Sequence, residues 1–173
     1  METGRERLRR RYRPAKVRLL FIGEAPPASG RFFYQRDSGL YRAIRDAFCS
    51  LDPSVTDEGF LDSFQNAGCY LIDACATPVD QLDARSRRAA CLASEALLSR
   101  RISLLQPSAI VILLRSIRSN VRRAAESAGW EGPMIELPYP GRWARHRETF
   151  LRTLVPQLKD RLNRGGGKLF DTE

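Results

Sequence analysis

The stretch Val17-Arg-Leu-Leu-Phe-Ile-Gly-Glu-Ala-Pro-Pro27 decides the fold of this chain. A short apolar run bounded by Gly and Pro is typical of a buried strand in a parallel sheet, and we expect that strand over residues 16–22. The segment after it should form a loop at the carboxyl end of the strand, where open α/β sheets place their ligand crevices. Glu24 is therefore either a candidate catalytic or binding group or an exposed acid in an ordinary connection.

Three later segments also have the character of strands. Cys69–Asp73 ends in an acid, Ser108–Leu114 is the most apolar and is expected at the centre of the sheet, and Met134–Leu137 is short. The carboxyl ends of parallel strands meet at one edge of a sheet. Glu24 and Asp73 should therefore lie at the same edge.

Helical patterns separate these strands. Ser38 is the expected N-cap of a first helix, and Asp57 is expected to cap a short second one that ends at Gly68. The first helix is expected over residues 39–49, and three later ones over residues 86–105, 115–128 and 142–162, the last kinked or ended early at Pro156. The order β-α-α-β-α-β-α-β-α predicts an α/β fold: a three-layer α/β/α sandwich with a mostly parallel four-stranded central sheet.

The chain of 173 residues is long enough for one domain with its own core. We expect that domain over residues 15–163, after a basic N-terminal arm over residues 1–14 and before a flexible Gly-rich tail over residues 164–173. The arm is either mobile and solvated or a short helix that lies on phosphates.

The net charge of +9 comes almost entirely from Arg. Arg guanidinium groups bind phosphates bidentately, so the composition favours a nucleic acid as partner. A composition biased by a GC-rich genome would explain Arg over Lys but not the excess of positive charge. No signal peptide or membrane span is apparent, so we expect a cytoplasmic protein with no membrane partner. The four cysteines contain no C-x-x-C pair, so we expect buried free thiols, no metal and no cofactor.

Several segments resemble the uracil-DNA glycosylase superfamily. Gly23–Pro27 looks like the Gly-Glu-Ala-Pro-Gly motif of its thermophile-type branch, and Gly30–Phe33 resembles the Gly-Arg-Pro-Phe that follows there. Leu104–Leu113 is similar to the Leu-Leu-x-Pro-x-x-Ile segment of the group, and Leu137–Pro140 falls where the family carries His-Pro-Ser-Pro. The resemblance covers roughly residues 16–155 and implies the superfamily fold, DNA as the partner and excision of a base from DNA.

The resemblance also implies a site for a flipped base. Asp73, which replaces the family's Asn, is the first candidate to activate water, and Glu24 is the second. Asp73 is otherwise an acid that caps a helix or a loop, and Glu24 is otherwise an exposed acid in an ordinary connection. Phe33 is expected to stack on the base, although one of Phe32 and Phe33 should simply be buried. The expected base-binding residues are Gly23, Ala25, Pro26, Phe33 and Leu137.

The loop after the fourth strand matches the segment that enters the minor groove in relatives. Tyr139 belongs to this loop, Arg142 and Arg145 are expected to bind phosphates, and Trp143 is either an apolar wedge or a residue packed inward.

The chain also departs from the family pattern. Leu137 stands in the position of the motif histidine, His146 is expected to be an ordinary surface residue, and no cysteine precedes Cys49, so no iron–sulfur cluster is expected. With Asp73 in place of Asn, hypoxanthine and xanthine are alternatives to uracil.

The leading hypothesis is a monomeric DNA glycosylase-like hydrolase that excises a deaminated base by base flipping and hydrolysis of the N-glycosidic bond. The alternative is a catalytically silent, nucleic-acid-binding member of the same fold, favoured by Leu137. A hydrolase of free nucleotides or nucleosides is a third possibility.

Overall fold

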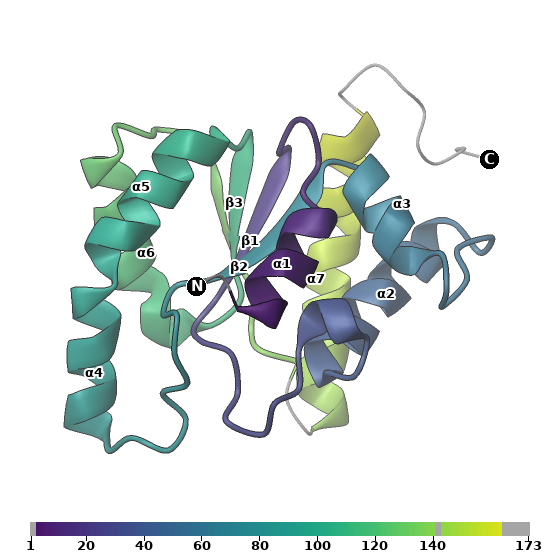
Figure 1. Ribbon diagram of the computed structural model, residues 1–173. Helices are drawn as coiled ribbons and strands as arrows, with labels where there is room; N and C mark the ends of the chain where they lie inside the picture. Colours follow the sequence, from purple (N-terminus) through teal and green to yellow (C-terminus); the bar gives the residue numbers. More distant parts are fainter. Residues whose placement is uncertain (1–2, 141–142, 164–173) are drawn as a thin grey trace.

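A computed structural model describes residues 3–140 and 143–163, and it contains a four-stranded sheet between two layers of helices (Figure 1). The strands are β1 (Leu19–Gly23), β2 (Cys69–Asp73), β3 (Ala109–Ile112) and β4 (Met134–Glu136). All neighbouring strands pair in parallel, in the order β2-β1-β3-β4. The predicted three-layer α/β/α sandwich is therefore confirmed, with every strand of the sheet parallel.

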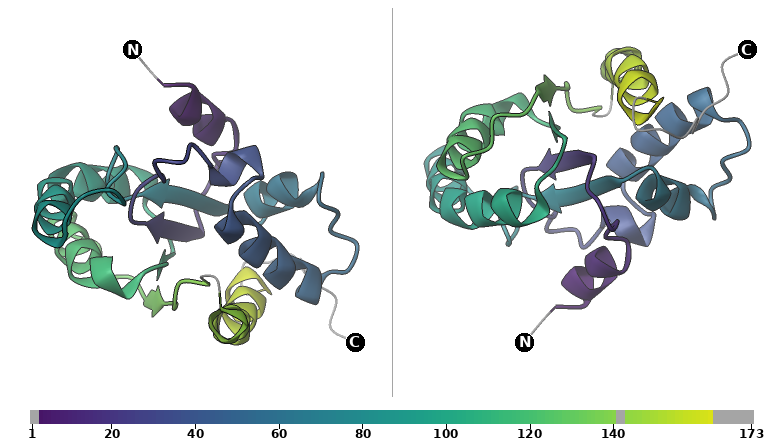
Figure 2. Two further views of the ribbon diagram at one scale, coloured as in Figure 1. Left: turned by 90° about the horizontal axis from the view of Figure 1, so that it is seen from below. Right: turned by 90° about the horizontal axis from the view of Figure 1, so that it is seen from above.

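The helices cover both faces of the sheet. Helices α4, α5 and α6 lie on one side, and α2, α3 and α7 lie on the other (Figure 2). Their bounds are α1 (Gly4–Arg11), α2 (Gly39–Leu51), α3 (Phe60–Asn66), α4 (Ala84–Ala93), α5 (Glu95–Leu105), α6 (Arg118–Ser127) and α7 (Ala144–Asn163), with 3-10 turns η1 (Phe33–Gln35) and η2 (Arg115–Ile117). None of the helices in the described part of the chain is both long and apolar enough to cross a membrane.

Local capping signals explain some helix boundaries and not others. Ser38 caps α2 as predicted, because its hydroxyl oxygen accepts a hydrogen bond from the Tyr41 N–H at 3.1 Å. Asp57 does not cap α3, which begins after Gly59; the Asp57 side chain instead pairs with Arg45 and accepts from the Tyr41 hydroxyl. The Asp57 carboxylate, which the local pattern predicted as a helix cap, thus binds Arg45 of α2 instead.

The predicted helix over residues 86–105 is two helices, α4 and α5, which meet at Ser94. The Ser94 hydroxyl donates to the Ala90 carbonyl at 2.9 Å, a local bond that competes with regular helix geometry. Helix α7, in contrast, continues through Pro156. The break thus occurs at Ser94, where none was predicted, and no break occurs at Pro156, where one was predicted.

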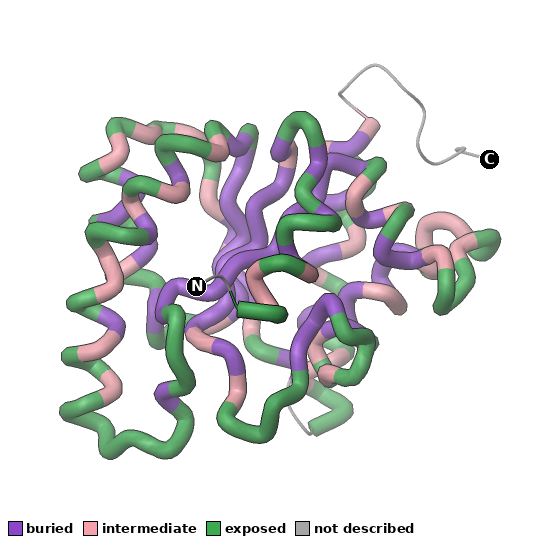
Figure 3. Tube along the Cα trace, in the orientation of Figure 1, coloured by how far each residue is buried: buried purple, intermediate pink, exposed green. Residues whose placement is uncertain are grey.

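Strands β1, β2 and β3 are buried along their length (Figure 3), whereas the first and last residues of β4 are only partly buried. Strands β1 and β3 occupy the interior of the sheet, and β3 is the segment that was expected there as the most apolar. Strand β2 lies at an edge, where the Tyr34 hydroxyl accepts from the Leu71 N–H at 2.8 Å and donates to the Leu71 carbonyl at 3.1 Å. A side chain thus satisfies backbone groups that an edge strand leaves unpaired.

The predicted basic arm forms helix α1 from Gly4 onward, with Thr3 as its N-cap. The Gln65 side chain of α3 donates to the carbonyls of Arg11 and Arg13 at 3.3 and 3.1 Å, which ties the end of α1 to the domain. Arg9 points inward and is only 5% exposed. The segment is therefore helical, with one arginine directed into the protein; that the helix lies on phosphates stays a prediction. The predicted tail over residues 164–173 lies outside the described residues.

Candidate functional site

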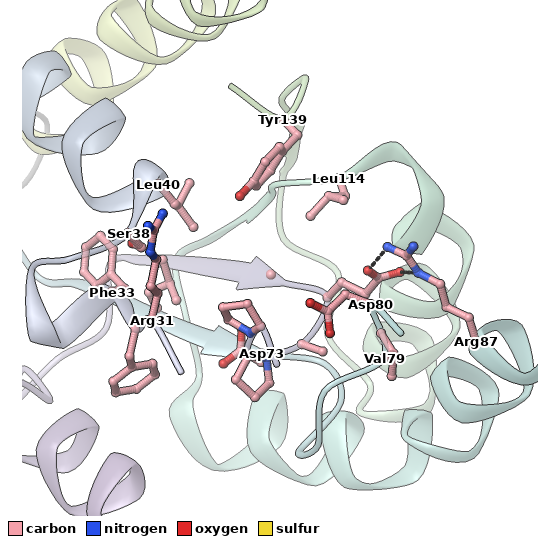
Figure 4. A pocket seen from close by; sticks show the side chains of 17 residues that line it. Arg31, Phe33, Ser38, Leu40, Asp73, Val79, Asp80, Arg87, Leu114 and Tyr139 are labelled. Carbon is pink, nitrogen blue, oxygen red and sulfur yellow. Dashed lines mark hydrogen bonds and ion pairs between the residues drawn. The ribbon is translucent and has the colours of Figure 1, made fainter. Parts of the chain in front are cut away.

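A cavity of about 430 Å³ opens at the carboxyl edge of the sheet (Figure 4). The segments at or after the ends of all four strands contribute to its wall, as do η1, α2 and α4. Its lining consists of Gly23, Glu24, Ala25, Pro26, Pro27, Arg31, Phe32, Phe33, Ser38, Leu40, Leu71, Asp73, Val79, Asp80, Arg87, Leu114 and Tyr139. The structure thus brings together Glu24, Phe33, Asp73 and the loop after β4, where open α/β sheets bind their ligands.

Asp73 is the last residue of β2 and is buried. Its Oδ2 accepts a hydrogen bond from Arg9 Nη2 at 2.6 Å, and its backbone carbonyl accepts from Arg101 Nη1 at 3.1 Å. Burial raises the pKa of Asp73 because it disfavours the carboxylate, and the positive charge of Arg9 opposes that rise. The site therefore holds a buried acid beside a dedicated cation.

Glu24 follows β1 and is also buried at the cavity wall. Arg87 of α4 binds it with two groups: Nε donates to Oε1 at 2.9 Å, and Nη2 donates to Oε2 (dashed lines in Figure 4). This two-point geometry fixes the plane of the carboxylate. The two acids of the cavity thus each have an arginine partner from a different helix.

Gly23 allows the two strand ends to pack closely. It pairs with Asp73 across the β1–β2 ladder, and a Cβ at Gly23 would lie 3.1 Å from Asp73 Oδ1. The ladder continues into the loops, where the N–H groups of Ala74 and Cys75 donate to the carbonyls of Gly23 and Glu24, both at 2.8 Å. Both carboxylates are therefore carried on adjoining, hydrogen-bonded backbone.

Phe32 and Phe33 both line the cavity, and both are buried. The Phe33 ring packs against Tyr34, Tyr41 and Phe64, with centroid distances of 5.0, 5.8 and 5.2 Å. Phe33 is therefore part of the aromatic core as well as part of the cavity wall. Ala25 and Pro26, assigned to the base pocket from the sequence, line the same cavity.

Leu137 was predicted to bind the base, but it is part of the hydrophobic core and not of the cavity wall. Its N–H donates to the Ile112 carbonyl at 2.9 Å, which extends the β3–β4 ladder by one residue, and its side chain is fully buried in the core. Because the ladder turns this side chain inward, Leu137 does not line the cavity. Tyr139, two residues later, is the contribution of this loop to the wall.

Two aromatic side chains that follow Leu137 are exposed to solvent. Tyr139 is 46% exposed and Trp143 is 66% exposed, so Trp143 is not packed inward. Arg145 is exposed, and Arg142 lies outside the described residues. His146 lines a neighbouring hollow that shares Leu114 and Tyr139 with the cavity.

Sequence reasoning missed Arg9 and Arg87, the partners of the two acids. The signal that could have indicated them is indirect: two acids at the edge of a buried sheet require compensating cations. The Arg-rich composition supplies many candidates, and no local spacing distinguishes these two from the others.

The cysteines were expected to be buried free thiols. Cys69, Cys75 and Cys91 are buried, whereas Cys49 is half-buried, and all four are free. Burial raises the pKa of the Cys91 thiol to about 12. Among the described residues no group of three His, Cys, Asp or Glu side chains is placed to hold a metal ion.

Comparison with known protein families adds a finding of its own. The family model of the Uracil DNA glycosylase superfamily matches residues 10–162, a segment that contains all four strands, Glu24 and Asp73. A search of the curated proteins returned no match.

Proposed function

The chain belongs to the uracil DNA glycosylase superfamily, and on that premise we propose that it is a DNA glycosylase that excises a deaminated base. The proposed substrates are uracil, hypoxanthine and xanthine in DNA, and the proposed setting is a cytoplasmic monomer. The observation that supports this most strongly is the single cavity that Glu24, Asp73 and two phenylalanine rings share at the sheet edge.

The proposed reaction is hydrolysis of the N-glycosidic bond after the nucleotide leaves the base stack. The oxygen of a water molecule bonds to the anomeric carbon as the bond to the base nitrogen breaks, and that bond's electron pair leaves with the base. Asp73 accepts a proton from the attacking water, and its charge favours the positive sugar of the transition state. The proton then passes to solvent or to the departing base.

The proposed role of Glu24 is secondary. Both oxygens of its carboxylate accept hydrogen bonds from Arg87, whereas Arg9 contacts Oδ2 of Asp73. Its place in the wall suits it to orient the nucleotide or the water. Phe32, Phe33, Ala25 and Pro26 would form the apolar walls around the base.

The leaving base needs a hydrogen-bond donor, and the loop after β1 and the segment after β4 offer few. Leu137 replaces the motif histidine and is buried away from the cavity, Pro26 and Pro27 have no N–H group, and the Ala28 N–H already donates to Asp80 at 3.2 Å. Loss of one preorganised donor costs about 10²–10³ in rate. Arg31, an exposed cation that lines the cavity, is the proposed replacement.

The donor-poor wall also supports a second candidate function, a nucleic-acid-binding protein without excision activity. Such a protein would bind DNA with a strong salt dependence. Its binding would survive both Asp73→Asn and Glu24→Gln, because neither carboxylate would be needed.

A single-turnover excision assay with enzyme in excess tests the proposal. The substrates are oligonucleotides with uracil, hypoxanthine or xanthine, single- and double-stranded, and free deoxynucleosides serve as the small-substrate arm. Asp73→Asn should lower the rate by about 10²–10⁴. Exposed acids provide matched controls, Asp62→Asn and Glu58→Gln, which should excise at the wild-type rate.

The outcomes separate the candidates. Base release from at least one DNA substrate that Asp73→Asn abolishes supports the glycosylase. Salt-dependent DNA binding without release of any base, at high enzyme, supports the silent binding protein. Turnover of deoxynucleosides with little DNA affinity indicates a hydrolase of free nucleotides or nucleosides.

A further inference from the structure

Helix α1 brings a cation into the wall of the cavity. The Arg9 side chain is 6% exposed, and its Nη2 lies 2.6 Å from Asp73 Oδ2. Arg9 lies just before the segment that the family model matches, which begins at residue 10. The family match therefore says nothing about this contact.

The guanidinium of Arg9 is held from several sides. Its Nη1 donates to Glu6 Oε1 one turn earlier in α1, and it lies over the ring of Phe32, 5.3 Å from the centroid. Phe32 itself lines the cavity. The planar group thus connects a surface acid, a wall of the cavity and Asp73, an arrangement that a lysine ammonium cannot reproduce.

The buried Arg9–Asp73 pair is expected to add little to the stability of the fold. Within the described residues, the buried Nε of Arg9 has no hydrogen-bond partner. Buried ion pairs are often no more stabilising than apolar residues of similar volume, because both charges lose their hydration. The pair is therefore better explained by what it does to Asp73 than by what it adds to stability.

The charges around Asp73 come from several elements. Helix α1 contributes Arg5, Glu6 and Arg9, and α5 contributes Arg101, whose guanidinium donates to the Asp73 carbonyl. The Tyr34 hydroxyl of η1 lies near Asp73, Tyr70 of β2 lies near Tyr34 and Arg9, and Glu24 is on the same cavity wall. Among the described residues, Arg9 is the cation whose side chain bonds directly to the Asp73 carboxylate.

We propose that Arg9 is a positioning residue of the site: it fixes the orientation of the Asp73 carboxylate and keeps it charged, so that α1 is a working part of the site. The consequence for catalysis rests on the proposed glycosylase function. The effect on the Asp73 carboxylate does not, and can be measured without a substrate.

The first measurement is a carbon-13 NMR titration of the Asp73 carboxyl, identified by its absence in Asp73→Asn. In Arg9→Gln the titration midpoint should rise, because burial continues to disfavour the carboxylate and the opposing cation is gone. The matched control is Arg7→Gln, an exposed arginine of the same helix, which should leave the midpoint unchanged. Arg9→Lys should raise the midpoint partway, and it decides the question if Arg9→Gln does not fold.

The second measurement is the pH dependence of single-turnover excision. Activity requires the charged carboxylate, so Arg9→Gln should lose about 10² in rate at neutral pH, the scale of a positioned base, and recover as the pH rises. An unchanged NMR midpoint, or a rate lowered equally at every pH, would overturn the proposal. A raised midpoint in a protein that excises nothing would leave the Arg9 assignment standing and refute the glycosylase function instead.

Discussion

The two sides of the cavity differ in their content of buried charged side chains. At the ends of β1 and β2, Glu24 and Asp73 are buried and each has a bound arginine. After β4, the chain contributes the half-exposed ring of Tyr139 to the wall, while Leu137 is buried in the core and Trp143 is exposed to solvent. One side keeps costly charges in fixed positions, and the other side has apolar and aromatic surface. If the proposed function holds, we expect the chemistry at the β1–β2 side and the contact with DNA at the β4 side.

The largest effect is expected from Leu137→Ala. Truncation of a fully buried leucine leaves a cavity in the core and should lower the free energy of unfolding by about 2–5 kcal/mol. Urea denaturation measures this, with Leu104→Ala as the control because Leu104 is 70% exposed and should change stability by less than about 0.5 kcal/mol. Equal, small effects for both variants would place Leu137 at the surface and remove the contrast between the two sides.

Arg87→Gln should have the next largest effect. It leaves the Glu24 carboxylate buried without its two-point partner, which costs about 1–3 kcal/mol of unfolding free energy. Arg88→Gln is the neighbouring control, since Arg88 is exposed. Thermal or urea unfolding compares the two. If Arg87→Gln is as stable as Arg88→Gln, the Glu24–Arg87 pair does not hold the β1 side together.

Trp143→Ala should weaken binding of DNA by about 1–2 kcal/mol, roughly tenfold, through loss of stacking or insertion against bases. Its unfolding free energy should stay within about 0.5 kcal/mol of wild type, because the side chain is 66% exposed. Fluorescence anisotropy at fixed salt measures the affinity. A loss of stability with no loss of affinity would show that the β4 side serves the fold and not the partner.

Gly23→Ala should have the smallest effect, about 1 kcal/mol of unfolding free energy. The added Cβ lies 3.1 Å from Asp73 Oδ1, so the carboxylate must shift against its bond to Arg9. Expressed as a free energy, the loss in excision rate should exceed the loss in unfolding free energy. Single-turnover excision and urea denaturation of the same variant measure the two. A variant with wild-type rate would show that the Asp73 position tolerates displacement.

Local patterns in the sequence predicted much of this protein. The apolar runs before Gly23 and over Cys69–Asp73 are strands, Ser38 is a cap, and the acids at the strand ends lie at one edge of the sheet. Each of these features depends on residues within a few positions of one another, or on the rule that parallel strands end together. Asp57 and Ser94 depart from the prediction because a distant partner or a competing local bond decides their conformation.

Sequence alone therefore determined the α/β order, the strand-end acids and the family resemblance. The tertiary structure decided which cations hold those acids: Arg9 lies 64 residues from Asp73, and Arg87 lies 63 residues from Glu24. It also decided that Leu137 faces the core and Tyr139 the cavity. The physical reason is that burial of a charge requires a partner wherever the fold can bring one, and in a chain with so many arginines only the packing of α1 and α4 against the strand ends selects these two.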